Sequence, residues 1–178
     1  MSIDLHIELT RPVNLYATLP KAAKIMAEML GSTTKPTFTL DVLKNGERLV
    51  PDTDLLSNFT SMQFLVSISG KPETAAITAI GSTAIVTMAA QRTNLEYVLG
   101  AVIAIQLARE LNESISDEWC FYGGQPVEKS AEALYDYLKV PDEGLELREA
   151  ADQLADRIGN PSLKEIGANR GLLRTEEN

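Results

Sequence analysis

The stretch that decides the fold runs from residue 74 to residue 112 and reads TAAITAI-GS-TAIVTMA over 74–89 and TNLEYVLGAVIAIQLARELN over 93–112. Its first part carries no charge and is broken at Gly81-Ser82, which predicts two antiparallel strands joined by a two-residue turn. Its second part is apolar nearly all round, which predicts a helix buried between a sheet and other helices. The pair Thr93 and Glu96 predicts the start of this helix, and Asn112 predicts its end.

The residues before this stretch predict more strands and one helix. Apolar residues alternate with polar ones over residues 3–9, as in a half-buried strand. Thr18-Leu19-Pro20 predicts a helix start with Thr18 as N-cap, and this helix runs to Leu30. Asn45-Gly46 predicts a hairpin turn between two strands, and residues 62–69 predict another strand.

The residues after this stretch predict short helices. Residues 115–122 are expected to be extended, Ser130 to cap a helix that ends at Leu138 or Lys139, and a further helix to run from about residue 142 to the stop signal at 159–161. Strands first and helices later predict an α+β fold, with a mostly antiparallel sheet in the N-terminal half covered by the long apolar helix and the shorter C-terminal helices. Residues 1–161 are expected to form one domain, and residues 162–178 a loosely ordered tail.

Composition excludes several classes of function. The 178 residues carry a net charge of −9, which argues against binding to nucleic acid. One Cys and one His allow neither an internal disulfide nor a closed zinc site. The apolar run 97–105 is shorter than the roughly 20 residues of a membrane span, and no secretory signal is visible, so the cytoplasm is the expected compartment.

No catalytic constellation emerges from the sequence. Gly123-Gly124 is the one Gly pair, and it is followed by Gln125-Pro126 rather than by a Lys-bearing helix start, so it predicts a turn and not a phosphate loop. Cys120 lies near acidic residues, which disfavour a reactive thiolate. We therefore expect a protein that is not an enzyme and that holds no cofactor and no metal.

The negative charge is concentrated in the C-terminal part. Residues 1–100 hold nine acids and eight bases, a net of −1, whereas residues 101–178 hold sixteen acids and eight bases, a net of −8. Aromatic residues are interleaved with these acids, and an acidic surface with aromatic anchors suits docking onto a basic protein. The candidate partner-binding residues are Glu113, Asp117, Glu118, Trp119, Tyr122, Glu128, Glu132 and Asp136. The alternative interpretation is that these acids are the solvated faces of helices.

The run 115–124, ISDEWCFYGG, follows the Ala-rich helix 93–112. In this plan the chain resembles the bacterial immunity proteins that act against toxins delivered by neighbouring cells, whether contact-dependent or polymorphic. The resemblance covers about forty residues and its motif is degenerate, so it assigns no functional residue. It implies a cognate toxin as partner, bound tightly and inhibited stoichiometrically, with the acidic surface masking a cationic active site.

Two other functions stay open at this point. One is a metal-dependent enzyme that uses carboxylates such as Asp117 and Glu118. The other is a homo-oligomeric structural or adaptor protein in which the helix 93–112 packs against its own copy, and a homodimer is compatible with the sequence.

Overall fold

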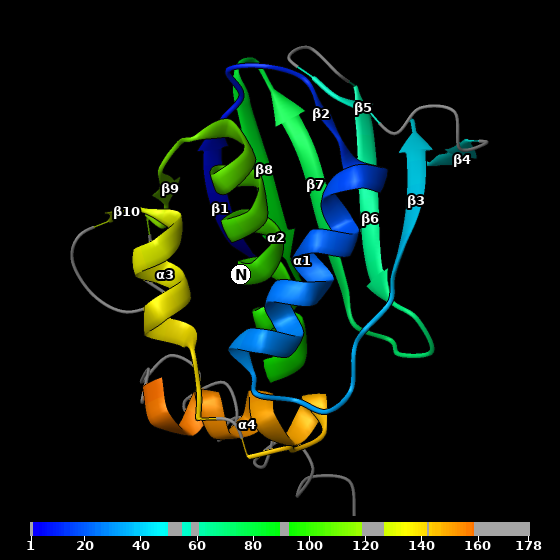
Figure 1. The fold of residues 1–178 in the computed structure, drawn as a ribbon. Helices are drawn as coiled ribbons and strands as arrows, with labels where there is room; N and C mark the ends of the chain where they lie inside the picture. The colour runs from blue at the N-terminus through cyan, green and yellow to red at the C-terminus, as the bar shows by residue number, and fades with distance from the viewer. Residues whose placement is uncertain are drawn as a thin grey trace, which may run out of the picture.

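The fold is α+β, with the helices gathered on one face of an antiparallel sheet (Figure 1). The computed structural model describes residues 2–49, 55–57, 61–89, 93–118, 127–141 and 143–158. Within these residues eight strands form the sheet in the order β10-β9-β1-β8-β7-β6-β3-β4, and every neighbouring pair is antiparallel. Their bounds are β1 Ile3–Glu8, β3 Phe38–Lys44, β4 Glu47–Leu49, β6 Met62–Ile68, β7 Thr74–Ile80, β8 Thr83–Met88, β9 Ile115–Ser116 and β10 Glu128–Lys129. A separate short pair joins β2 (Val13–Asn14) to β5 (Leu55–Leu56).

The two predicted hairpins are confirmed, and their turn residues explain them. Asn45 and Gly46 both have positive φ, 53° and 82°, as a two-residue turn between β3 and β4 requires. Gly81 has a φ of 57° at the first central position between β7 and β8. These conformations suit the right-handed twist of the strands that they connect, so the local sequence specifies each turn.

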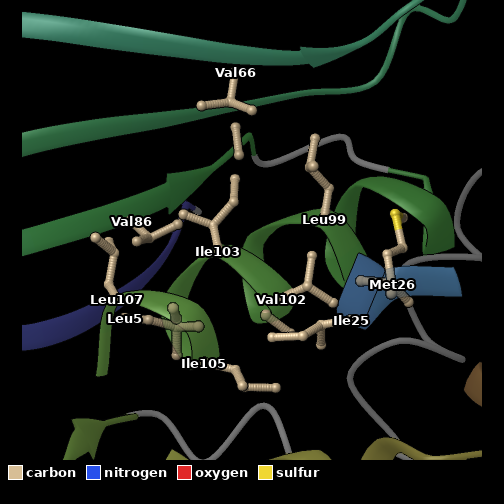
Figure 2. Packing of buried hydrophobic residues seen from close by; sticks show 14 of the residues in the cluster. Leu5, Ile25, Met26, Val66, Val86, Leu99, Val102, Ile103, Ile105 and Leu107 are labelled. Carbon is tan, nitrogen blue, oxygen red and sulfur yellow. The ribbon is translucent and has the colours of Figure 1, made fainter. Parts of the chain in front are cut away.

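The long helix α2 (Asn94–Leu111) lies at the centre of the molecule, as predicted. The Thr93 side chain accepts a hydrogen bond from Glu96 N, and Asn112 ends the helix in the left-handed conformation with a φ of 59°. Its apolar residues are all buried, since α2 packs on β1, β7 and β8 and against the other helices α1 (Leu15–Met29), α3 (Ala131–Leu138) and α4 (Leu147–Ile158). Figure 2 shows the side chain of Ile103 on α2 next to Val86 of the sheet, and Val102 of α2 beside Ile25 of α1.

Gly100 lets α2 approach the sheet closely. A Cβ at this position would lie 2.0 Å from Sδ of the buried Met88 on β8. The absence of a side chain at this point of the helix is therefore a packing requirement of the α2–β8 contact.

The predicted start of the first helix was wrong by one turn. Asn14, not Thr18, is the N-cap of α1, and its Oδ1 accepts a hydrogen bond from Ala17 N at 2.9 Å. Thr18 lies inside the helix and is buried, and its hydroxyl donates to Asn14 O and to the Glu110 carboxylate, both at 2.8 Å. Pro20 therefore lies inside the helix and not in its first turn.

The predicted start of the last helix was also wrong. Helix α4 begins at Leu147, because Gly144 has a φ of 65° and Leu145 forms a parallel bridge with Ser32. Of the predicted extended segment 115–122, residues 115–116 form β9, and residues 119–122 lie outside the described part of the chain. The expected tail 162–178 also lies outside it.

Candidate partner-binding surface

Four elements, α2, β9, β10 and α3, form one corner of the molecule next to the C-terminal end of α2. After Asn112 the chain reverses into β9, which pairs with β1 through His6↔Ser116 and Ile7↔Ile115. Strand β10 then pairs with β9, and the Ser130 side chain caps α3 by accepting a hydrogen bond from Ala133 N at 3.1 Å. This path brings three predicted site residues together, namely Glu113, Glu128 and Glu132.

These three carboxylates line an open hollow of about 520 Å³, which we call the acidic hollow. Arg109 of α2 and Lys129 of β10 also line it. A smaller hollow of about 280 Å³ adjoins it and shares Glu113, Ser114 and Glu128. Its other walls include His6 and Glu8 of β1, so acidic side chains continue from the end of α2 to strand β1.

Arg109 compensates one of the three carboxylates. Its Nε and Nη2 each donate to Glu132 at 2.8 Å, and the guanidinium lies 4.9 Å from the centre of the Tyr135 ring. Hydrogen bonds from Arg109 hold the pKa of Glu132 below its usual value, and the same contact raises the pKa of Arg109. Glu113 and Glu128 have no ion-pair partner among the described residues, so they leave the acidic hollow with uncompensated negative charge.

Asp117 does not belong to this surface, which corrects the prediction for that residue. Its side chain is 1% exposed and lies 3.6 Å from Nζ of Lys129, which is itself buried. Its backbone N–H donates to Val127 O at 2.9 Å. Asp117 therefore joins the segments of β9 and β10 inside the fold and cannot meet a partner unless the fold opens.

The other predicted residues divide into two groups. Glu118 and Asp136 are exposed, and Asp136 follows Glu132 by four residues on α3, so the two share one face of that helix. Trp119 and Tyr122, the predicted aromatic anchors, lie outside the described residues.

Not all the acids of the C-terminal part face solvent. Glu110 is largely buried and receives hydrogen bonds from Thr18 and Lys21 of α1, both at 2.8 Å. Glu146 accepts from Thr34 at 3.0 Å and Asp152 from Asn94 at 2.7 Å, so both join distant segments. The acids of this part are therefore divided among structural contacts, the acidic hollow, and exposed positions outside the hollow such as Glu118, Asp136 and Glu149.

Sequence reasoning missed the contributions of Arg109, His6 and Glu8. Arg109 stands at the end of a helix, where a basic residue is common, and nothing in its surroundings in the sequence points to Glu132. His6 and Glu8 were assigned to the polar face of the first strand, but their place beside Glu128 depends on the pairing of β9 with β1.

The described residues bring no three His, Cys, Asp or Glu side chains together in a group that could hold a metal ion. In the same part of the chain, no helix has both the length and the apolar character of a membrane span. Comparison with protein-family models, with curated proteins and with solved structures finds no match to this chain.

Proposed function

We propose that this chain is an acidic binding protein that neutralises a basic protein toxin by docking through the acidic hollow. The observation that carries the proposal is that Glu113 and Glu128 line one hollow and have no ion-pair partner among the described residues, while Glu110 and Asp117 are engaged in contacts inside the fold. A basic partner would supply the missing cations.

The setting of these carboxylates favours recognition of a partner. Glu113 directly follows the helix C-cap, and its backbone N–H donates to Ala108 O at 3.0 Å. Glu128 is held in β10 by the pairing with β9. Charges fixed on helices and strands lose little freedom on binding, and they attract an oppositely charged partner over long distances. The site therefore suits fast and specific docking.

The inhibitory role comes from the resemblance to bacterial immunity proteins and from the chemistry of a cationic active site. Many enzymes that act on phosphates use Lys and Arg to bind substrate. A carboxylate-rich surface placed over such a site competes with the substrate by offering the same negative charge. The pair Arg109–Glu132 at the rim of the hollow would fix the orientation of the bound partner.

The test is charge reversal at the acidic hollow with a matched control. The partner to be measured is the basic protein retained from host extract by the immobilised chain, and the product of the neighbouring reading frame is the first protein to be compared with it. We expect Glu113→Lys and Glu128→Lys each to weaken its binding by about tenfold or more, equivalent to about 1.4 kcal/mol, in isothermal titration calorimetry.

Glu149→Lys is the control, because Glu149 is an exposed acid on α4 and lies outside the hollow. Its change in net charge is the same, so a general electrostatic effect would weaken binding equally in all three variants. Equal losses in the three, or no loss in any, would contradict the proposed site. Inhibition of the toxin activity should fall in parallel with affinity.

A further inference from the structure

The face of the sheet that points away from the helices is uncovered among the described residues. The helices α1 and α2 lie on the other face, where the inward residues of β1, β6, β7 and β8 are buried (Figure 1). On the uncovered face the strand residues are half-buried or exposed, and Ile80 of β7 is 67% exposed.

The centre of this uncovered face carries no charge. The outward residues of β6, β7 and β8 are Thr, Ser, Gln, Ala, Ile and Leu, in a protein with a net charge of −9. Depletion of charge is the compositional sign of an interface centre, and β-branched side chains form a firm, regular surface for packing. This face has the composition of a contact surface and not of an ordinary solvated sheet.

One row of the uncovered face crosses all eight strands with one residue from each. The strand register gives Glu128–Ser116–His6–Ile85–Thr78–Gln63–Leu43–Arg48. The row has a carboxylate at one end and a guanidinium at the other. A two-fold axis parallel to the strands and placed between β7 and β8 would relate this row to the same row of a second copy. Glu128 of one copy would then lie opposite Arg48 of the other copy.

We propose that the uncovered face is the contact between two copies of this chain, which stack as an aligned β-sandwich about that axis. Glu128 of each copy then faces Arg48 of the other, at both ends of the row, and Ile85 faces Thr78 at the centre. The Arg48 guanidinium already pairs with Asp41 of its own chain and has further donors for a second carboxylate. Two negatively charged copies repel each other, and the uncharged centre over β6, β7 and β8 keeps the outward acids of the face, Asp4 and Glu8 on β1 and Asp41 on β3, away from the axis.

The size of the face is sufficient for such a dimer. Strands about 4.8 Å apart with about 3.4 Å per residue give about 650 Å² for the eight strands of the sheet, or about 1,300 Å² over two copies. This lies within the range of stable protein interfaces, about 1,200–2,000 Å². Stacked sheets commonly align within about 30° of each other, as this axis requires.

The first experiment measures the mass of the full chain in solution by light scattering and sedimentation. We expect a dimer for the unmodified protein and a monomer for Thr78→Lys, since this change places two like charges near the axis. Circular dichroism should show that the variant is folded, because the Thr78 side chain points away from the core. Gln153→Lys is the control on an exposed position of α4, and it should remain dimeric.

A monomeric unmodified protein, or a dimer that Thr78→Lys leaves intact, would overturn the proposal. The second experiment tests the axis. We expect Arg48→Glu and Glu128→Arg each to raise the dimer dissociation constant by about tenfold, and the double variant to restore it. A double variant as weak as the single ones would also overturn it. Thr78→Lys distinguishes loss of the dimer from loss of toxin binding, because Thr78 lies outside the acidic hollow, whereas Glu128 belongs to both surfaces and its variants change both associations.

Discussion

The buried ion pair of Asp117 and Lys129 connects the candidate surface to the rest of the fold. Two charges removed from water stabilise each other, and the loss of one is costly because the other stays buried without this ion pair. The pair holds the segments that carry Glu118 and Glu128, so its role is to position the surface and not to contact the partner.

Removal of Lys129 tests this role. We expect Lys129→Met to lower the free energy of unfolding by about 3 kcal/mol, because the Asp117 carboxylate is left buried. The double variant Lys129→Met, Asp117→Leu should recover most of that loss. Urea denaturation at neutral pH measures both. Glu132→Gln, which breaks the exposed pair with Arg109, should cost less than about 1 kcal/mol. A similar cost for the buried and the exposed pair would contradict the assignment.

Helices α1 and α2 are joined by polar contacts as well as by their apolar faces. Glu110 near the end of α2 receives hydrogen bonds from Lys21, Thr18 and Gln106, of which the first two belong to α1. Burial alone would raise the pKa of Glu110, but these three hydrogen bonds outweigh burial and hold the pKa below its ordinary value of 4.5. The folded state therefore favours the charged carboxylate, and protonation weakens the α1–α2 contact.

The sign of the resulting pH dependence follows from linkage. A carboxyl with a lowered pKa in the folded state stabilises the protein above its unfolded pKa, and this stabilisation is lost as the pH falls through the folded pKa. We expect Glu110→Gln to lower the urea midpoint at about pH 7 and to have a smaller effect at a lower pH, because the stabilisation by the charged carboxylate is lost as the pH falls through the folded pKa of Glu110. Glu149→Gln on the exposed face of α4 is the control. An equal effect of Glu110→Gln at both pH values would show that the carboxylate charge is not the cause.

The hydrophobic pattern predicted most elements correctly because each depends on neighbours in the sequence. The hairpin at Asn45-Gly46, the caps of α2 and α3, and the buried character of α2 are all local properties. The apolar residues of α2 are buried within one chain, so this helix has no apolar side chain left for contact with a second copy. The predicted start of α1 is wrong because Asn14 caps the helix one turn before Thr18, and the predicted start of α4 is wrong because the distant bridge of Leu145 with Ser32 holds the preceding residues in another conformation.

The whole molecule presents two surfaces of different character. One is the acidic hollow at the end of α2, and the other is the outward face of the sheet, whose centre is uncharged, and the two share Glu128. Salt screens the attraction between exposed charges and leaves contacts between uncharged side chains largely unaffected. The two proposed associations should therefore respond differently to ionic strength.

Raising the salt concentration separates them. We expect the affinity for the basic partner to fall by about tenfold or more between about 0.05 M and about 0.5 M NaCl, and the dimer dissociation constant to change by a smaller factor, because only the Glu128–Arg48 pairs at the ends of that contact are charged. Calorimetry follows the first association and sedimentation the second. An affinity for the partner that is independent of salt would contradict docking through Glu113 and Glu128.

The sequence by itself determined the α+β class, the hairpins, the buried central helix and the concentration of acids in the C-terminal part. These follow from local periodicity, from turn residues and from composition. Only the tertiary structure decided which acids meet, because β9 reaches β1 across more than a hundred residues, as in the pair His6↔Ser116. A pairing over that distance leaves no local pattern, yet it buries Asp117 and brings Glu113 and Glu128 to one hollow.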